Sequence, residues 1–206
     1  MAHVLFDKEE LQGREGYFLI TSIVVPRPIA WVSSLAADGT LNLAPHSYFN
    51  IISSGPPIVH FTSTGIKDSV TNVKATGEFV INIVNEQMME QMNATAANFP
   101  PEENEFEWAG VETAPSAYVA PPRVARAPAA LECKLNQIVS LGNGHMVFGD
   151  VVAIHVDEEV MSEGRVEADL LKPLGRLGGS NYTTVAGHTL RIARPTWDDM
   201  KERGKQ

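Results

Sequence analysis

The sequence contains one cysteine, Cys133, among 206 residues, which excludes an internal disulfide bond. Disulfides are typical of oxidising compartments, so a lone cysteine favours the reducing cytoplasm. No apolar run approaches the roughly 18 residues that cross a bilayer, and the chain does not open with a signal-peptide pattern. We therefore expect a cytoplasmic protein that does not insert into a membrane.

Basic residues are also scarce. Lys and Arg number 16 against 25 Asp and Glu, and the formal net charge is −9. Nucleic-acid binding depends on Lys and Arg that neutralise phosphates, so nucleic acid is not expected as a partner. An anionic small molecule would need local features instead, such as backbone N–H groups, hydroxyls and one or two placed cations.

Several familiar motifs are missing. The chain has no G-x-G-x-x-G after a strand, no G-x-x-x-x-G-K-[ST] and no G-x-S-x-G, so Rossmann, P-loop and common serine-hydrolase interpretations have no support. With one cysteine and scattered histidines, no metal site is expected; the histidines without ligand spacing are His3, His46, His60, His155 and His188. A nicotinamide dinucleotide, if used, would have to bind transiently in an open cleft.

Short apolar segments separated by turn signals predict one mainly β domain over residues 1–206. The length and the 44% apolar content are sufficient for a single sizeable core. We predict helices near 67–76, ending at Gly77, and near 86–97. The segment 16–25 suits either a strand or a short helix. The predicted strands lie near 29–35, 40–49, 57–63, 78–84, 130–140 and 145–156.

The segment 98–129 is the least regular, with several prolines and an acidic run at 102–107. A loop of that length is usually a lid or a partner arm, or is poorly ordered, and the sequence leaves these alternatives open. Trp31 and the methionines near 88–92 are more typical of core than of a cofactor site.

One stretch has the composition of an anion site. The strand at 57–63 ends in hydroxyls, Ser63 and Thr64, and a helix opens shortly afterwards at Lys67-Asp68-Ser69. Free N–H groups and the helix dipole favour negative charge at such a position. Beside a phosphate, the Asp68 side chain could cap the helix by accepting N–H groups that the phosphate does not use. An ordinary capped helix with an exposed lysine is the plainer alternative.

Several blocks, in order, resemble the flavin-reductase-like family. They are R-P-I-A-W-V-S-S at 27–34, N-L-A-P-H-S-Y-F-N at 42–50, K-D-S-V-T-N at 67–72, G-N-G-H at 142–145 and P-L-G-R-L-G-G-S-N-Y at 173–182. The resemblance covers about residues 17–195. Asn143 departs from the family pattern, which has Asp there, so a carboxylate that orients His145 is not expected.

The resemblance implies a six-stranded antiparallel Greek-key split β-barrel with peripheral helices, working as a homodimer with FMN at the interface. Lys67 and the neighbouring hydroxyls would then bind the FMN phosphate. Backbone and polar groups near the two first strands would meet the flavin ring, although Ser47 and Asn50 also suit plain turns. The full set of candidate FMN-binding residues is Ser33, Ser34, Ser47, Tyr48, Phe49, Asn50, Ser63, Thr64, Lys67, Asp68, Ser69 and Arg176.

His145 is the candidate for a catalytic role, because a histidine near the ring could orient a nicotinamide or help to protonate reduced flavin. A histidine that only forms hydrogen bonds at a hairpin is the alternative. Arg176, among glycines, would reach the FMN phosphate or a nicotinamide pyrophosphate, or would lie exposed in a turn.

Three functions remain open. The first is a reductase that transfers a hydride from NAD(P)H, a transient co-substrate, to bound FMN. The second is an FMN-containing electron carrier, similar to flavoredoxin, with a redox partner protein. The third is a flavin-binding protein without catalysis.

Overall fold

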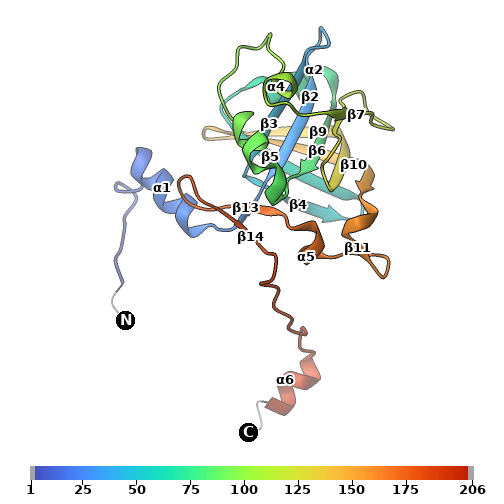
Figure 1. Cartoon of the computed structure of the whole chain (residues 1–206). Helices are drawn as coiled ribbons and strands as arrows, with labels where there is room; N and C mark the ends of the chain where they lie inside the picture. The colour runs from blue at the N-terminus through green and yellow to red at the C-terminus, as the bar shows by residue number, and fades with distance from the viewer. Residues whose placement is uncertain (1–2, 204–206) are drawn as a thin grey trace.

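The computed structural model describes residues 3–203, and it is mainly β. Its main sheet has seven antiparallel strands in the order β3-β2-β6-β9-β10-β5-β4 (Figure 1). The bounds are β2 Ala30–Leu35, β3 Leu41–His46, β4 Phe49–Ser54, β5 Pro57–Thr64, β6 Glu78–Ile83, β9 Ala129–Leu141 and β10 Gly144–Val156. All six predicted strands are present.

The predicted number of six strands is wrong, because β4 adds a seventh. No strand is predicted between those near 40–49 and 57–63, yet Phe49–Ser54 pairs with β5. β4 is an edge strand, and its central residues Asn50, Ile51 and Ile52 are all exposed. Since neither face is regularly buried, the sequence shows no apolar alternation there.

The two edge strands of the sheet are neighbours in the chain. β3 and β4 occupy opposite ends of the strand order, but only Ser47 and Tyr48 separate them. Three Cα–Cα steps span at most about 11 Å, so the sheet must curl until its edges meet at this dipeptide. The Ser47-Tyr48 link therefore marks the place where the barrel is split.

The core lies on both faces of the curled sheet. Phe61, Phe79 and Val147 belong to one buried cluster, together with Val70 and Val73 of α2 (Asp68–Thr76). α2 ends at Gly77, whose positive φ of 75° suits glycine.

Trp31 lies in the second buried cluster, as predicted, and its Nε1 donates to the Thr95 hydroxyl at 2.8 Å. Met88 and Met92, in η1 (Glu86–Met88) and α3 (Met89–Ala94), pack in the same cluster. The predicted helix near 86–97 is therefore shorter and is divided into these two parts.

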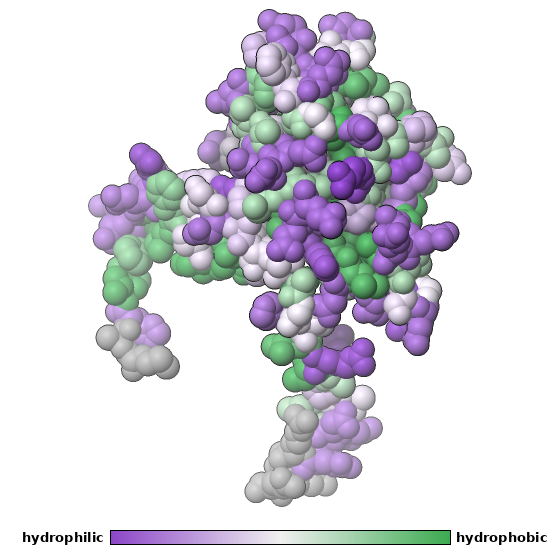
Figure 2. Space-filling model, viewed as in Figure 1, coloured by the Kyte–Doolittle hydropathy of each residue, from purple (hydrophilic) through white to green (hydrophobic). Residues whose placement is uncertain are grey.

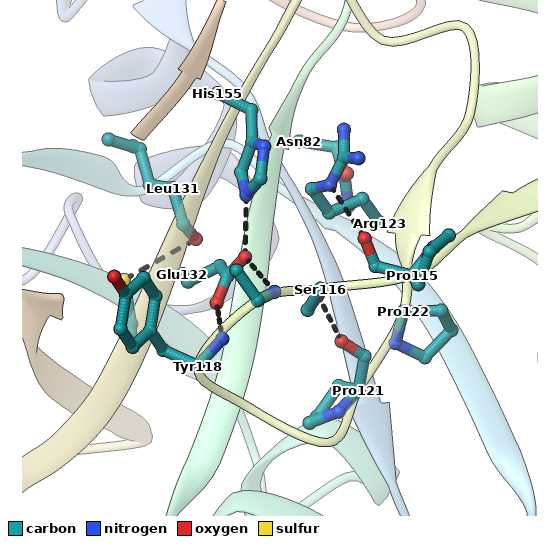
Figure 3. A network of polar contacts seen from close by, with 12 residues as sticks. Asn82, Pro115, Ser116, Tyr118, Pro121, Pro122, Arg123, Leu131, Glu132 and His155 are labelled. Atoms are coloured by element: carbon teal, nitrogen blue, oxygen red, sulfur yellow. Dashed lines mark hydrogen bonds and ion pairs between the residues drawn. The ribbon is translucent and has the colours of Figure 1, made fainter. Parts of the chain in front are cut away.

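The segment 98–129 packs against the barrel through buried carboxylates. Glu132, on β9, accepts the N–H groups of Ala117 and Tyr118 at 2.7 and 2.6 Å and contacts His155 Nε2 at 2.5 Å (Figure 3). Glu105 accepts the N–H of Leu43 on β3 at 3.0 Å. The segment also contains α4 Glu105–Trp108, β7 Thr113–Ala114 and β8 Arg123–Val124.

The remaining elements lie around the barrel. The segment that suited either a strand or a helix is a helix, α1 Gly13–Ile23, and it stands away from the main sheet, as does the C-terminal α6 (Figure 1). No helix among residues 3–203 is long and apolar enough to cross a membrane. The peripheral elements are β1 Arg27–Pro28, η2 Glu158–Val160, β11 Met161–Ser162, β12 Arg165–Val166, α5 Ala168–Leu171, β13 Leu174–Arg176, β14 Tyr182–Thr184 and α6 Trp197–Arg203.

Candidate functional site

A cavity of about 310 Å³, here called the first chamber, lies where the barrel is split. This volume is within the ~300–1,000 Å³ typical of small-molecule sites. Its wall combines the end of β3, the Ser47-Tyr48 link, the end of β5 and the start of α2. The lining residues are Tyr17, Asn42, Ala44, Pro45, His46, Ser47, Tyr48, Thr62, Ser63, Thr64, Lys67, Asp68, Ser69, Thr95, Ala96, Ala97, Asn98, Phe99 and Glu105.

The start of α2 presents donors to the first chamber. Lys67 is the N-cap residue; its carbonyl accepts the N–H groups of Val70 and Thr71, and its side chain forms no capping bond. Among the hydrogen bonds of the described residues, none uses the N–H of Asp68 or Ser69. Asp68 is the first helical residue, so the predicted cap by Asp68 is wrong. Lys67 and these N–H groups therefore form the electropositive end of the chamber.

The hydroxyl of Ser69 is held by a buried hydrogen-bond network. Asn42 Nδ2 donates to it at 3.2 Å, and His46 Nε2 lies 3.2 Å from it. The same Asn42 amide donates to Ser34 Oγ at 3.1 Å. These residues link β2, β3 and α2, so the hydroxyl has a fixed position at the chamber wall.

The charges in the first chamber are arranged by burial. Burial, aided by the positive charge of Lys67, lowers the pKa of His46 to about 4, so the imidazole is neutral at neutral pH. Burial also raises the pKa of Glu105, although hydrogen bonds from its own N–H and that of Leu43 oppose the change. Lys67 is therefore the one basic side chain of this lining that is charged at neutral pH.

A second chamber of about 440 Å³ adjoins the first. The two share Tyr17, Pro45, Ser47 and Ala96, so molecules in the two chambers would be neighbours. Its other lining residues are Phe18, Thr21, Arg27, Ile29, Met92, Asn93, Arg176, Leu177, Gly179, Ser180 and Tyr182.

The structure brings most of the candidate residues together. Those that line the first chamber are Ser47, Tyr48, Ser63, Thr64, Lys67, Asp68 and Ser69. Arg176 lines the second chamber instead, so its guanidinium and the Lys67 ammonium belong to different compartments.

Four candidates lie outside both linings. Ser33 and Ser34 are 0% exposed. The Ser33 hydroxyl donates to the Pro122 carbonyl, and the Ser34 hydroxyl accepts a hydrogen bond from the Asn42 amide behind the chamber wall. Phe49 packs against the core, and Asn50 accepts the N–H of Ile51 on β4. The side chains of these four residues therefore line neither chamber, and their assignment to FMN stays a prediction that would involve backbone groups.

His145 also lies outside both linings. It is on β10, paired in register with Ser63, and its Nδ1 is 2.8 Å from Ser140 Oγ. Directly paired residues of an antiparallel ladder point to the same face of the sheet, so His145 is on the Ser63 face.

The sequence interpretation missed four features of the lining. Tyr17 comes from a helix with no ligand motif, and Glu105 comes from the irregular acidic segment. Residues 95–99 directly follow the end of α3. His46 had a signal, because it stands inside the N-L-A-P-H-S-Y block.

The sequence pattern of the flavin reductase like domain matches residues 22–174. The chain belongs to the flavin reductase like domain family. Similar solved structures include nitrilotriacetate monooxygenase component B from Bacillus cereus, at 35% identity and a TM-score of 0.89, covering 93% of this chain and 100% of that one. Another is the 2-nitrobenzoate 2-nitroreductase of Pseudomonas fluorescens, at 37% identity and a TM-score of 0.87, covering 94% and 98%.

A solved structure from Shewanella frigidimarina, described with a split barrel domain, matches at 23% identity and a TM-score of 0.79, covering 95% of this chain and 100% of that one. That likeness bears on the fold. It agrees with the curled sheet whose edges meet at Ser47 and Tyr48.

Proposed function

We propose that this protein is a homodimeric, cytoplasmic oxidoreductase that binds FMN in the first chamber and reduces it with NADH or NADPH. The observation that carries the proposal is the start of α2, where Lys67, Ser69 and two free N–H groups face a cavity in a flavin-reductase fold. The lone Cys133, which is buried, suits the reducing compartment.

The donors of the first chamber fit a phosphate group. Lys67 supplies one charge, the N–H groups of Asp68 and Ser69 supply fixed donors, and Thr64 and Ser69 supply hydroxyls. The Asp68 and Glu105 carboxylates oppose an anion, but burial favours the neutral acid at Glu105. The phosphate would lie at the Lys67 end of the chamber, because the positive charge and the free N–H groups are there.

The flavin ring would meet a less charged wall. Tyr48, Pro45 and Phe99 supply aromatic and apolar surface, and Ser47 supplies polar groups between the chambers. When bound, FMN supplies the hydride-accepting chemistry, and the chain binds it and orients its partner. His145, on the face of Ser63, is proposed to orient the nicotinamide.

The exposed face of α1 supports the homodimer. Ile20 and Ile23 are 56% and 69% exposed, and Figure 2 shows apolar surface along this part of the molecule. Apolar side chains gathered on a protruding helix are typical of an association surface. Because α1 also supplies Tyr17 to both chambers, dimer formation would support the site.

An FMN-containing electron carrier is the second candidate. The acidic run at 102–107 supports it, since Glu102, Glu103 and Glu107 would repel a pyridine dinucleotide but could contact a basic redox protein. In that case the flavin would be reduced by a partner protein and not by free nicotinamide.

Absorbance spectroscopy tests the proposal and separates the candidates. The purified protein, supplied with FMN, should show a bound-flavin spectrum, and anaerobic NADH or NADPH should bleach it. Binding without bleaching by either nucleotide would refute the reductase and leave the carrier or a non-catalytic flavin protein. No bound flavin after FMN addition would refute all three.

A further inference from the structure

The second chamber holds a cation that the fold does not neutralise. Arg176 Nη2 donates to the Gly179 carbonyl at 2.6 Å, and the guanidinium carbon lies 4.4 Å from the centre of the Tyr182 ring. No Asp or Glu among residues 3–203 forms an ion pair with it. In a chain of net charge −9, an oriented guanidinium without a carboxylate partner is suited to an anionic ligand.

The other arginine of the chamber has a structural role. Arg27 is buried, and its Nη1 donates to the carbonyls of Thr21 and Val24 at the end of α1. Its Nη2 donates to the carbonyl of Leu177 in the β13–β14 turn at 3.0 Å. These bonds fasten α1 to the turn, which leaves Arg176 as the cation available to a ligand.

The chamber walls are closely fitted. A Cβ added at Gly178 would lie 2.4 Å from Ser22 Oγ, so the turn and α1 meet without room for a side chain. Tyr17, Phe18 and Tyr182 supply aromatic surface to the same chamber, and of these the Tyr182 ring lies against Arg176. A chamber with aromatic walls and one available guanidinium matches a planar ring that carries one oxyanion.

We infer that the second chamber binds a small aromatic carboxylate, held by Arg176 and the rings of Tyr17 and Tyr182, next to the first chamber. The guanidinium of Arg176 can pair with both oxygens of one carboxylate. The shared wall of Tyr17, Pro45, Ser47 and Ala96 places this ligand beside the proposed flavin. Only that adjacency rests on the proposed function, because the carboxylate contacts do not involve FMN.

Isothermal titration calorimetry on the FMN-saturated protein tests the inference with benzoate and its neutral analogue benzyl alcohol. Benzoate should bind at least about ten-fold more tightly than benzyl alcohol, since a charge-assisted pair contributes that much or more. Arg176→Gln should weaken benzoate about ten-fold and leave benzyl alcohol unchanged. Arg165→Gln, in the exposed β11–β12 hairpin, is the matched control and should change neither.

Equal affinities for the two probes, or unchanged benzoate binding by Arg176→Gln, would overturn the inference. Weaker FMN binding by Arg176→Gln, or displacement of benzoate by FMN, would assign Arg176 to the flavin and would also overturn it. Loss of NADPH binding by Arg176→Gln, without an effect on benzoate, would assign the chamber to the nucleotide. A wild-type protein that binds benzoate but not FMN would refute the proposed function and leave this inference standing.

Discussion

The imidazole of His46 lies 3.2 Å from the hydroxyl of Ser69, inside the first chamber. Asn42 already donates to the same oxygen, and the neutral His46 ring accepts the Ser69 hydroxyl hydrogen at Nε2 in the tautomer whose other ring nitrogen donates to the Thr62 backbone. The neutral ring, packed 4.7 Å from Phe61, thus connects the core with the chamber wall.

The low pKa of His46, about 4, makes stability depend on pH. Since the unfolded histidine protonates near pH 6.5 and the folded one does not until about pH 4, acid favours unfolding in this window. Between about pH 7 and pH 5, the free energy of unfolding should fall by about 2 kcal/mol from this residue.

Urea unfolding at the two pH values measures the effect, with His46→Gln as the reference. The variant should lose about 2 kcal/mol less than the wild type over this interval. An identical pH dependence in the two proteins would contradict a buried neutral His46.

Lys67→Ala should weaken FMN binding about ten- to hundred-fold, because one charge-assisted hydrogen bond to phosphate is lost. Riboflavin, which lacks the phosphate, should bind the variant and the wild type alike. Flavin fluorescence quenching measures both affinities. Lys74→Ala is the control, because Lys74 is exposed in the last turn of the same helix. An equal loss of affinity for FMN and riboflavin in Lys67→Ala would count against a phosphate contact.

His145→Ala should retain FMN and slow its reduction by nicotinamide, because orientation is lost while the phosphate site remains. Stopped-flow absorbance under anaerobic conditions gives the reduction rate per bound flavin. Ser140→Ala, which removes the 2.8 Å contact to His145 Nδ1, should slow reduction less. Loss of flavin from His145→Ala with an unchanged rate would make His145 a structural residue.

Local signals were sufficient to predict most of the fold. Short apolar segments separated by turn signals correctly indicated six strands, and Gly77 correctly indicated the end of α2. β4 was missed because an exposed edge strand carries no periodic apolar pattern. The segment 16–25 stayed ambiguous, since a peripheral helix buries little of its surface.

The candidate site was predictable only where its parts are contiguous in sequence. Ser63, Thr64, Lys67 and Ser69 follow one another along β5 and α2, so one motif indicates them together. The burial of Ser33 and Ser34 could not be predicted locally, because both faces of β2 are covered by the distant segment at 115–122 and by α2. The contribution of Tyr17 depends on how α1 docks, which no local pattern encodes.

Glu132→Gln should destabilise the protein by about 1.5–3 kcal/mol, because a buried carboxylate accepts two backbone N–H groups and contacts His155 (Figure 3). Burial raises the pKa of Glu132, but these partners outweigh burial and keep the pKa below its usual value. Guanidinium unfolding at neutral pH measures the loss.

Glu78→Gln is the matched control for Glu132. Glu78 accepts the N–H of Ala120 from the same segment at 2.8 Å, but it is only half-buried. Its replacement should cost about 1 kcal/mol or less, since water replaces part of the lost bond. An equal loss of unfolding free energy in the two variants would show that the burial of Glu132 does not strengthen its hydrogen bonds to the segment.

Ile20→Asp combined with Ile23→Asp should convert the proposed homodimer into monomers. Both side chains are exposed on α1, and a buried carboxylate in an apolar interface costs several kcal/mol, enough to raise the dimer dissociation constant at least about hundred-fold. Sedimentation velocity measures the change, with Leu141→Asp, 67% exposed on the β9–β10 hairpin, as the control. Because α1 supplies Tyr17 to both chambers, the monomeric variant should also bind FMN more weakly. A wild-type monomer with full FMN affinity, or a double variant that stays dimeric, would exclude α1 as the interface.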